Sequence, residues 1–289
     1  MLVDGEQWVD LGGVRQWVRI EGAQRGTVPL VVVHGGPGGH HWVFERTAGR
    51  LLARERTVVY HEQRGCGRSE APADPGAYSI PLLTQDLAEL VSWLGVPQVD
   101  LLGYSFGGGL ALEMASAHPQ QVRRMIAQAP VLDLHDPEVI HHQLAGFLAC
   151  AQGEVAARLS ALSRPSPAEQ LEAFWAAVDT PTVDRFLFQN PECARQNRQW
   201  WAESGLVNTG QMARALAREQ APSHSAVGRV EAPVLLLIGR HDRNVPLAHL
   251  ERLAEGLTDA RLVLFEHSAH FPDLEETERY TRAVVDFLA

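Results

Sequence analysis

The amino-acid sequence predicts an α/β fold, in which a mostly parallel sheet is covered by helices and a helical module is inserted late in the chain. Three observations lead to this prediction. Short, continuous apolar runs alternate with helical segments up to residue 130. Strand character then disappears over the stretch 131–225 and returns near residue 232. Continuous apolar strands that alternate with helices are typical of a parallel sheet buried on both faces.

The first elements are expected to be a hairpin followed by strands and helices in turn. Two β-rich runs flank Gly12-Gly13, and a Gly-Gly pair between such runs indicates a hairpin turn. The next strands are expected at 29–33, 57–60, 99–104 and 124–129. The apolar spacing predicts helices over 81–94 and 105–117.

The second half of the chain divides into an insertion and a return to the core. In 131–225, Ala, Leu, Gln, Arg and Trp recur at helical spacing and are interrupted by prolines. Strands are expected again at 232–239 and 261–266, before a final amphipathic helix over 273–288. Residues 1–130 and 226–289 therefore form the expected core.

The composition excludes several classes of function. The 289 residues carry a formal net charge of −10, which argues against nucleic acid or an anionic membrane as a partner. All 25 basic residues are arginine, and this excludes the lysine chemistry of a Walker A loop, a pyridoxal Schiff base or a Ser-Lys dyad. Cys66, Cys150 and Cys193 show no CxxC spacing, so neither a disulfide framework nor a zinc site is expected.

The remaining sequence features favour a cytoplasmic protein without a cofactor or metal. The first residues do not resemble a signal peptide, and no apolar run approaches the roughly 18 residues of a membrane span. The pairs His40-His41 and His141-His142 have no carboxylate at metal-ligand spacing.

The segment Gly103-Tyr104-Ser105-Phe106-Gly107 places a serine between an apolar strand and a helix. It matches the pattern G-x-S-x-G, in which glycines let the strand and the helix approach closely and the serine hydroxyl stands above the sheet. A tight turn without a catalytic role could have the same five-residue pattern. The strand–turn–helix context favours a catalytic nucleophile at Ser105, at the positive end of a helix.

A serine nucleophile needs a base, and the base needs an acid that orients it. Asp242 follows a strand after Ser105 and is the expected acid, although it could instead cap the helix near Pro246. His270 is the expected base rather than His267, because His270 lies further from its strand end, on the loop that enters the last helix. The neighbouring His241 is expected to be a surface residue.

Three motifs give the chain a resemblance to the α/β hydrolases, and within them to the proline iminopeptidase-like family. They are His34-Gly35-Gly36-Pro37-Gly38-Gly39, Gln63-Arg64-Gly65-Cys66-Gly67-Arg68-Ser69 and the Ser105 elbow, with Asp242 and His270 in the family's later places. The resemblance covers about 28–130 and 232–289. It implies a mostly parallel eight-stranded sheet and a helical cap, or lid, at 131–225.

The attack of Ser105 on a carbonyl produces an oxyanion, which needs N–H donors already in place. The N–H of Phe106, directly after the nucleophile, is one expected donor. The resemblance places the other at Gly36. Arg64 and Arg68 are expected to fix neighbouring loops through carboxylates.

The cap is expected to contribute to substrate binding. Most of its aromatic residues are expected to form its own core. Trp200 and Trp201 are adjacent and cannot both point into one helical core, so we expect them to line an apolar pocket with Tyr104. An aminopeptidase must also bind a free ammonium, for which Glu203 is the first candidate and Glu192 the second; either could instead be a solvated surface residue.

These features predict a serine hydrolase that cleaves an amide after an N-terminal aminoacyl group, through an acyl-enzyme. The expected partner is a small molecule or short peptide with a free amino group, such as a natural-product intermediate. An esterase, thioesterase, lactonase or C–C bond hydrolase could use the same triad. A non-catalytic binding protein on the same fold is the alternative from another class.

Overall fold

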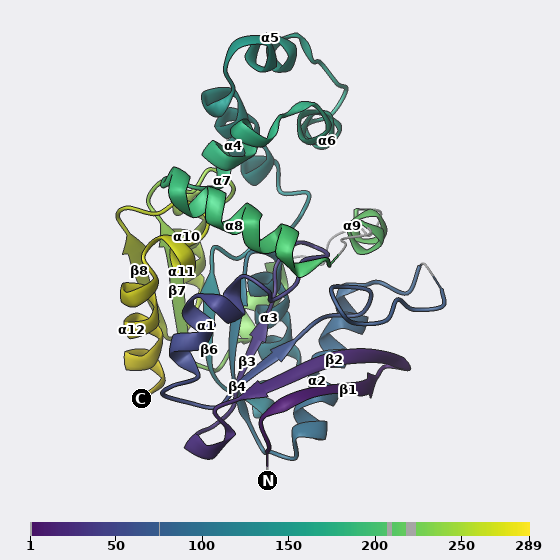
Figure 1. Ribbon diagram of the computed structural model, residues 1–289, viewed down its shortest axis with the longest axis vertical. Coiled ribbons are helices and arrows are strands. Elements are labelled where there is room, and N and C mark those ends of the chain that lie inside the picture. The colour runs from purple at the N-terminus through teal and green to yellow at the C-terminus, as the bar shows by residue number, and fades with distance from the viewer. Residues whose placement is uncertain (1, 75, 207–209, 218–223) are drawn as a thin grey trace.

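A computed structural model describes residues 2–74, 76–206, 210–217 and 224–289. An eight-stranded sheet in the order β1-β2-β4-β3-β5-β6-β7-β8 runs through the described chain (Figure 1). Only β2 is antiparallel to its neighbours, β1 and β4; the other adjacent strands are parallel. The strands are β1 (Gly5–Leu11), β2 (Val14–Glu21), β3 (Leu30–Val33), β4 (Val58–His61), β5 (Val99–Tyr104), β6 (Val122–Gln128), β7 (Val234–Gly239) and β8 (Ala260–Phe265). This confirms the expected eight-stranded, mostly parallel sheet.

Helices cover both faces of the sheet, because successive residues of each central strand point to opposite sides. In β3, Val31 and Val33 pack in the apolar cluster that includes α2 (Ile80–Leu94), α3 (Phe106–Ala117) and α10 (Leu247–Gly256). Leu30 and Val32 pack in the other cluster, with α1 (Ala48–Leu52) and α12 (Thr277–Leu288). All four β3 side chains are buried, which explains the continuous apolar run in the sequence.

The strands expected at 29–33, 57–60, 99–104, 124–129, 232–239 and 261–266 agree with the observed ones to within two residues at each end. The final helix differs, because it is divided into α11 (Pro272–Glu275) and α12 at Glu276. The backbone of Glu276 (φ −129°, ψ 49°) is not helical. Its carboxylate accepts hydrogen bonds from the His267 N–H at 3.0 Å and the Ser268 hydroxyl at 2.7 Å. The break thus fixes the loop that precedes α11.

A set of helices is inserted between β6 and β7, and the described residues in this interval contain no strand. Figure 1 shows most of the inserted helices beyond the sheet, on the side opposite the two chain termini. They are α4 (Pro137–Cys150), α5 (Gly153–Ala161), α6 (Pro167–Ala177), α7 (Thr180–Leu187), α8 (Pro191–Ser204) and α9 (Gln211–Leu216). The cap limits 131 and 225 stay predictions, and residues 218–223 near the second limit lie outside the described residues.

The inserted helices have an apolar core of their own. Phe147, Phe174 and Phe186 are buried together there, and the rings of Phe147 and Phe186 stack at 4.0 Å between centroids. Four of the helices have a proline at their first or second position, where the missing N–H costs nothing. In the described part of the chain, no helix combines the length and apolarity that crossing a membrane requires.

Candidate active site

Ser105 lies on a sharp turn between β5 and α3. Its backbone (φ 56°, ψ −125°) is strained for a residue with a side chain. A Cβ at Gly103 would overlap the Gly107 carbonyl, and a Cβ at Gly107 would overlap the carbonyls of Val33 and His34. The two glycines are therefore required by the close approach of strand and helix, as the elbow pattern predicts.

Asp242 lies on the loop after β7, where its carboxylate has two roles. One oxygen, Oδ2, lies 2.8 Å from Nδ1 of His270. The other, Oδ1, accepts the N–H groups of Asn244 at 2.7 Å and Val245 at 2.9 Å. Both side chains of the Asp242–His270 pair are buried. Because a carboxylate is an acceptor, the facing Nδ1 carries the imidazole proton and Nε2 is left with a lone pair.

His270 lies on the loop between β8 and α11 and is anchored from both sides. Its main-chain N–H donates to the carbonyl of Leu187 in the cap at 3.0 Å. Its Nε2 lies 3.2 Å from the side-chain nitrogen of Asn244. His270 and Ser105 line the same cavity. His267 is instead exposed at the end of β8, and His241 is half-buried.

Two main-chain N–H groups next to the serine have no acceptor among the described residues. The N–H of Phe106 belongs to the first turn of α3, where a helix has no internal acceptor. The N–H of Gly36 lies on the loop after β3. Gly36 has φ 133°, and a Cβ there would overlap the main chain of Gly38. Glycine thus allows a backbone shape in which this N–H remains available.

The cavity around Ser105 has a volume of about 410 Å³ and lies between the sheet and the cap. The cap supplies Trp175, Leu187, Asn197 and Trp201. The core supplies apolar groups, the Ser105–His270 pair, and the polar residues His40, Asn244 and Asp273. No arginine occurs among the described residues that line it, and the described residues contain no group of three or more side chains placed to hold a metal ion.

A family model described as alpha/beta hydrolase fold matches residues 28–277. The chain belongs to this family. It is 25% identical to a proline iminopeptidase of Clostridioides difficile (strain 630) over 98% of this chain and 97% of the relative. It is 29% identical to a 2-hydroxymuconate semialdehyde hydrolase of Pseudomonas sp. (strain CF600), over 90% and 87% of the two chains.

The fold of this hydrolase also matches solved structures. A proline iminopeptidase-related protein from Thermus thermophilus superposes with a TM-score of 0.80, at 23% identity over 99% of this chain and 98% of that one. These matches confirm the resemblance to proline iminopeptidase-like hydrolases that the three sequence motifs indicate.

The two cap tryptophans that the sequence singles out lie in different places in the structure. Trp201 lines the cavity, with its ring centroid 3.8 Å from that of His40, and Tyr104 lines it from the core. Trp200 lies instead in a surface groove with Arg46 and Arg50. Adjacent residues on a helix point about 100° apart, so α8 can direct only one of the two tryptophans into the cavity.

The two glutamates expected to bind an ammonium lie outside the cavity. Both are exposed on α8. Glu203 accepts a hydrogen bond from Gln199 at 2.8 Å, and Glu192 forms an ion pair with Arg195. Neither is among the residues that line the cavity around Ser105.

Sequence reasoning missed Asp273, a carboxylate in the cavity wall. Its side chain is 4% exposed, and burial raises its pKa to about 6. The side-chain amide of Gln128 donates to Oδ1 at 2.9 Å. The only sequence signal was position, since Asp273 follows His270 by three residues. Asn244 was missed as well, although it lies two residues after Asp242.

The arginines of the loop after β4 hold neighbouring segments, as the sequence predicts. Arg64 donates to both carboxylate oxygens of Asp86 in α2, at 2.7 and 2.6 Å. Arg68 donates to Glu62 at 3.0 Å and to Glu45 at 2.7 Å. This network supports the loops around the site without lining the cavity.

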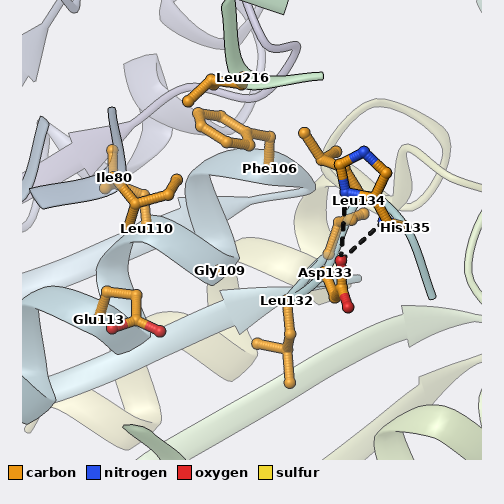
Figure 2. Close-up of a pocket in the computed structure, with 11 residues that line it drawn as sticks. Ile80, Phe106, Gly109, Leu110, Glu113, Leu132, Asp133, Leu134, His135 and Leu216 are labelled. Atoms are coloured by element: carbon orange, nitrogen blue, oxygen red, sulfur yellow. Dashed lines mark hydrogen bonds and ion pairs between the residues drawn. The ribbon is translucent and has the colours of Figure 1, made fainter. Parts of the chain in front are cut away.

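A second, smaller pocket of about 30 Å³ lies beside α3 (Figure 2). Phe106 directs its ring into this pocket, among Ile80, Leu110 and Leu216, and Glu113 lies at its edge. None of the three expected triad residues lines it. The pocket therefore belongs to the packing around Phe106 and is separate from the cavity that Ser105 lines.

Proposed function

We propose that this hydrolase cleaves an amide bond after an N-terminal aminoacyl group, with Ser105 as its nucleophile. One observation carries the proposal. Ser105 on its strained elbow and His270, which is held by Asp242, face one cavity together with Gly36. A nucleophile, a base, an orienting acid and an N–H donor are the groups that acyl transfer needs.

The reaction begins when Nε2 of His270 takes the proton of the Ser105 hydroxyl and the oxygen attacks the substrate carbonyl. Asp242 keeps the proton of the neutral imidazole on Nδ1 and stabilises the imidazolium that forms. The N–H groups of Gly36 and Phe106 bind the oxyanion. His270 then gives its proton to the leaving amine, which departs from an acyl-enzyme. Water, activated by His270, hydrolyses the acyl-enzyme and restores Ser105.

The choice of an aminoacyl substrate is supported by the relatives and by the cavity. The likeness to a proline iminopeptidase extends over 98% of the chain. A cavity of about 410 Å³ suits a small acyl group and a short leaving group, such as an aminoacyl residue on a peptide or small natural product. Arg243, next to Asp242, packs against Gly146 of α4 and does not line the cavity. The described walls therefore contain no arginine that would repel an ammonium.

A second candidate is hydrolysis of an ester or a C–C bond by the same groups. The observation that favours it is the 29% identity to the 2-hydroxymuconate semialdehyde hydrolase. The largely apolar wall, which includes Trp175 and Trp201, would also accept an acyl group without an amine.

Turnover of matched substrates separates the two candidates. The panel consists of aminoacyl p-nitroanilides, the same anilides with an acetylated amine, and simple p-nitrophenyl esters. We expect the free-amine anilides to be hydrolysed and acetylation to abolish turnover. Ser105→Ala is the control, and we expect it to lower kcat by about a thousandfold or more. Turnover of the esters alone, or equal turnover of free and acetylated anilides, would favour the second candidate.

A further inference from the structure

Asp273 is a buried carboxylate that lacks a cationic partner among the described residues. It lines the cavity, and its described side-chain donor is the neutral amide of Gln128. Neither of the two nearby tyrosine hydroxyls donates a hydrogen bond to Asp273. The hydroxyl of Tyr104 donates to the carbonyl of His40 at 3.2 Å, and the buried hydroxyl of Tyr280 has no hydrogen-bond partner in the described structure.

A carboxylate in such a place is costly unless something compensates its charge. Removal from water disfavours the ionised form. The two neutral donors of Asp273, the Gln128 amide and its own main-chain N–H, do not replace the lost hydration. Buried carboxylates in proteins are generally paired, as Asp86 is with Arg64. Asp273 has no such arginine in the described wall. A cation that enters the cavity would therefore balance the charge of its carboxylate.

The remaining titratable groups of the wall leave the negative charge of Asp273 uncompensated at neutral pH. Burial lowers the pKa of His40 to about 4, which keeps its ring neutral. Burial raises the pKa of Asp273 to about 6, so its carboxyl is mostly ionised near pH 7. A charged His270 would lower the pKa of Asp273, but its ring nitrogen Nδ1 faces the carboxylate of Asp242. The exposed Glu192 and Glu203 do not reach the cavity.

We propose that Asp273 binds the free ammonium of the substrate's aminoacyl group. The inference rests on the proposed function and names the residue that selects for a free amine. Asp273 and His270 share one wall, and Gln128 donates both to the His270 carbonyl at 3.2 Å and to Asp273. An ammonium held there would occupy the cavity that Ser105 and His270 also line. The charge pair forms in a site shielded from water, where it is worth more than at a surface.

The alternative role for Asp273 is to position His270 through Gln128. The two roles differ in what they predict for a neutral ligand. A positioning residue would affect charged and neutral ligands alike, whereas an ammonium-binding residue affects only the charged one.

The test compares prolinamide, which carries an ammonium, with cyclopentanecarboxamide, its neutral isostere. Dissociation constants are measured by ligand-observed NMR in the Ser105→Ala protein, so that turnover does not interfere. We expect this protein to bind prolinamide more tightly than the isostere, and Asp273→Asn to weaken prolinamide about tenfold or more. The isostere should change by less than about threefold. The amide oxygen of Asn can still accept from Gln128; should that variant not fold, Asp273→Ser replaces it.

Glu203→Gln in the same background is the matched control, because it removes a carboxylate outside the cavity. We expect it to leave the preference for prolinamide intact. Equal affinity for the two ligands before Asp273 is changed, an equal loss for both after the change, or loss of the preference in Glu203→Gln would each overturn the inference. The anilide panel tests the proposed function separately: turnover of free-amine anilides together with any of these results removes only the role of Asp273.

Discussion

At the scale of single residues, the charge of Asp273 should make the protein less stable at neutral pH. Burial raises the pKa of Asp273 from its ordinary value of 3.8 to about 6, so the folded protein holds this proton more tightly than the unfolded chain. The sign follows from this: below pH 3.8 both states are protonated and no penalty exists, whereas above about pH 6 both are ionised and the full penalty applies.

Asp273→Asn should therefore raise the free energy of unfolding near pH 7, by up to about 3 kcal/mol. The gain should shrink as the pH falls from about 6 towards 3.8. Urea unfolding across this range measures it, and Asp259→Asn, at an exposed carboxylate before β8, is the control. A variant that is less stable than the wild type near pH 7 would show that the carboxylate is already compensated in the folded protein.

The sequence indicates the three residues that we propose as the triad, whereas it does not indicate Asp273, and the reason is physical. Ser105 is indicated by local geometry, since Gly103 and Gly107 are needed wherever a strand and helix meet so closely. Asp242 and His270 follow from the order of strands along the chain. The burial of Asp273 depends on Tyr104, Gln128 and the cap, which meet it only after folding. The residues next to Asp273 in the sequence do not distinguish it from an exposed carboxylate.

At the scale of elements, Glu275 in α11 connects the loop that carries His270 to the cap. One carboxylate oxygen accepts the N–H groups of Gln189 and Asn190, in the turn between α7 and α8, at 2.7 and 2.6 Å. The other oxygen accepts the N–H of Ala269, next to His270, at 2.6 Å. Three main-chain donors from two segments thus depend on one half-buried side chain.

Glu275→Ala should loosen both segments at once. We expect kcat to fall about tenfold, because His270 loses a fixed neighbour, and the free energy of unfolding to fall by about 2 kcal/mol. Steady-state kinetics on any substrate of the panel and urea unfolding measure the two effects. Glu278→Ala, at an exposed position of α12, is the matched control. Unchanged kcat in Glu275→Ala would mean that the His270 loop is held by its other contacts, such as those of Glu276.

The break in the last helix could not be predicted either, because it also depends on contacts between segments that meet only in the folded protein. The apolar spacing of 273–288 suits one continuous helix. The break at Glu276 arises because its carboxylate bonds back to His267 and Ser268, a contact between segments that the periodicity does not report. Likewise, helical spacing shows that α8 is a helix but does not decide that Trp201 faces the core domain while Trp200 does not.

At the scale of the whole molecule, hydrogen bonds connect the cap to the loop that carries Asp242. Nε2 of His142 in α4 donates to the main-chain carbonyl of Asp242 at 2.9 Å. The amide of Gln143 donates to the carbonyl of Asn244 at 3.1 Å and to its Oδ1 at 2.9 Å. The second contact fixes the side chain of Asn244, whose nitrogen faces Nε2 of His270. The cap therefore holds the loop of Asp242 as well as lining the cavity around Ser105.

Loss of the α4 contacts should lower the rate of the chemical step more than the affinity for substrate. For Gln143→Ala we expect kcat to fall about tenfold with KM changed by less than about threefold, since a small displacement of Asp242 misorients the base without altering the cavity walls. His141→Ala is the matched control, because His141 is exposed and lies two residues before Gln143 on the same helix. A rise in KM at constant kcat would instead mean that α4 acts on the substrate and that the acid loop keeps its geometry without the cap.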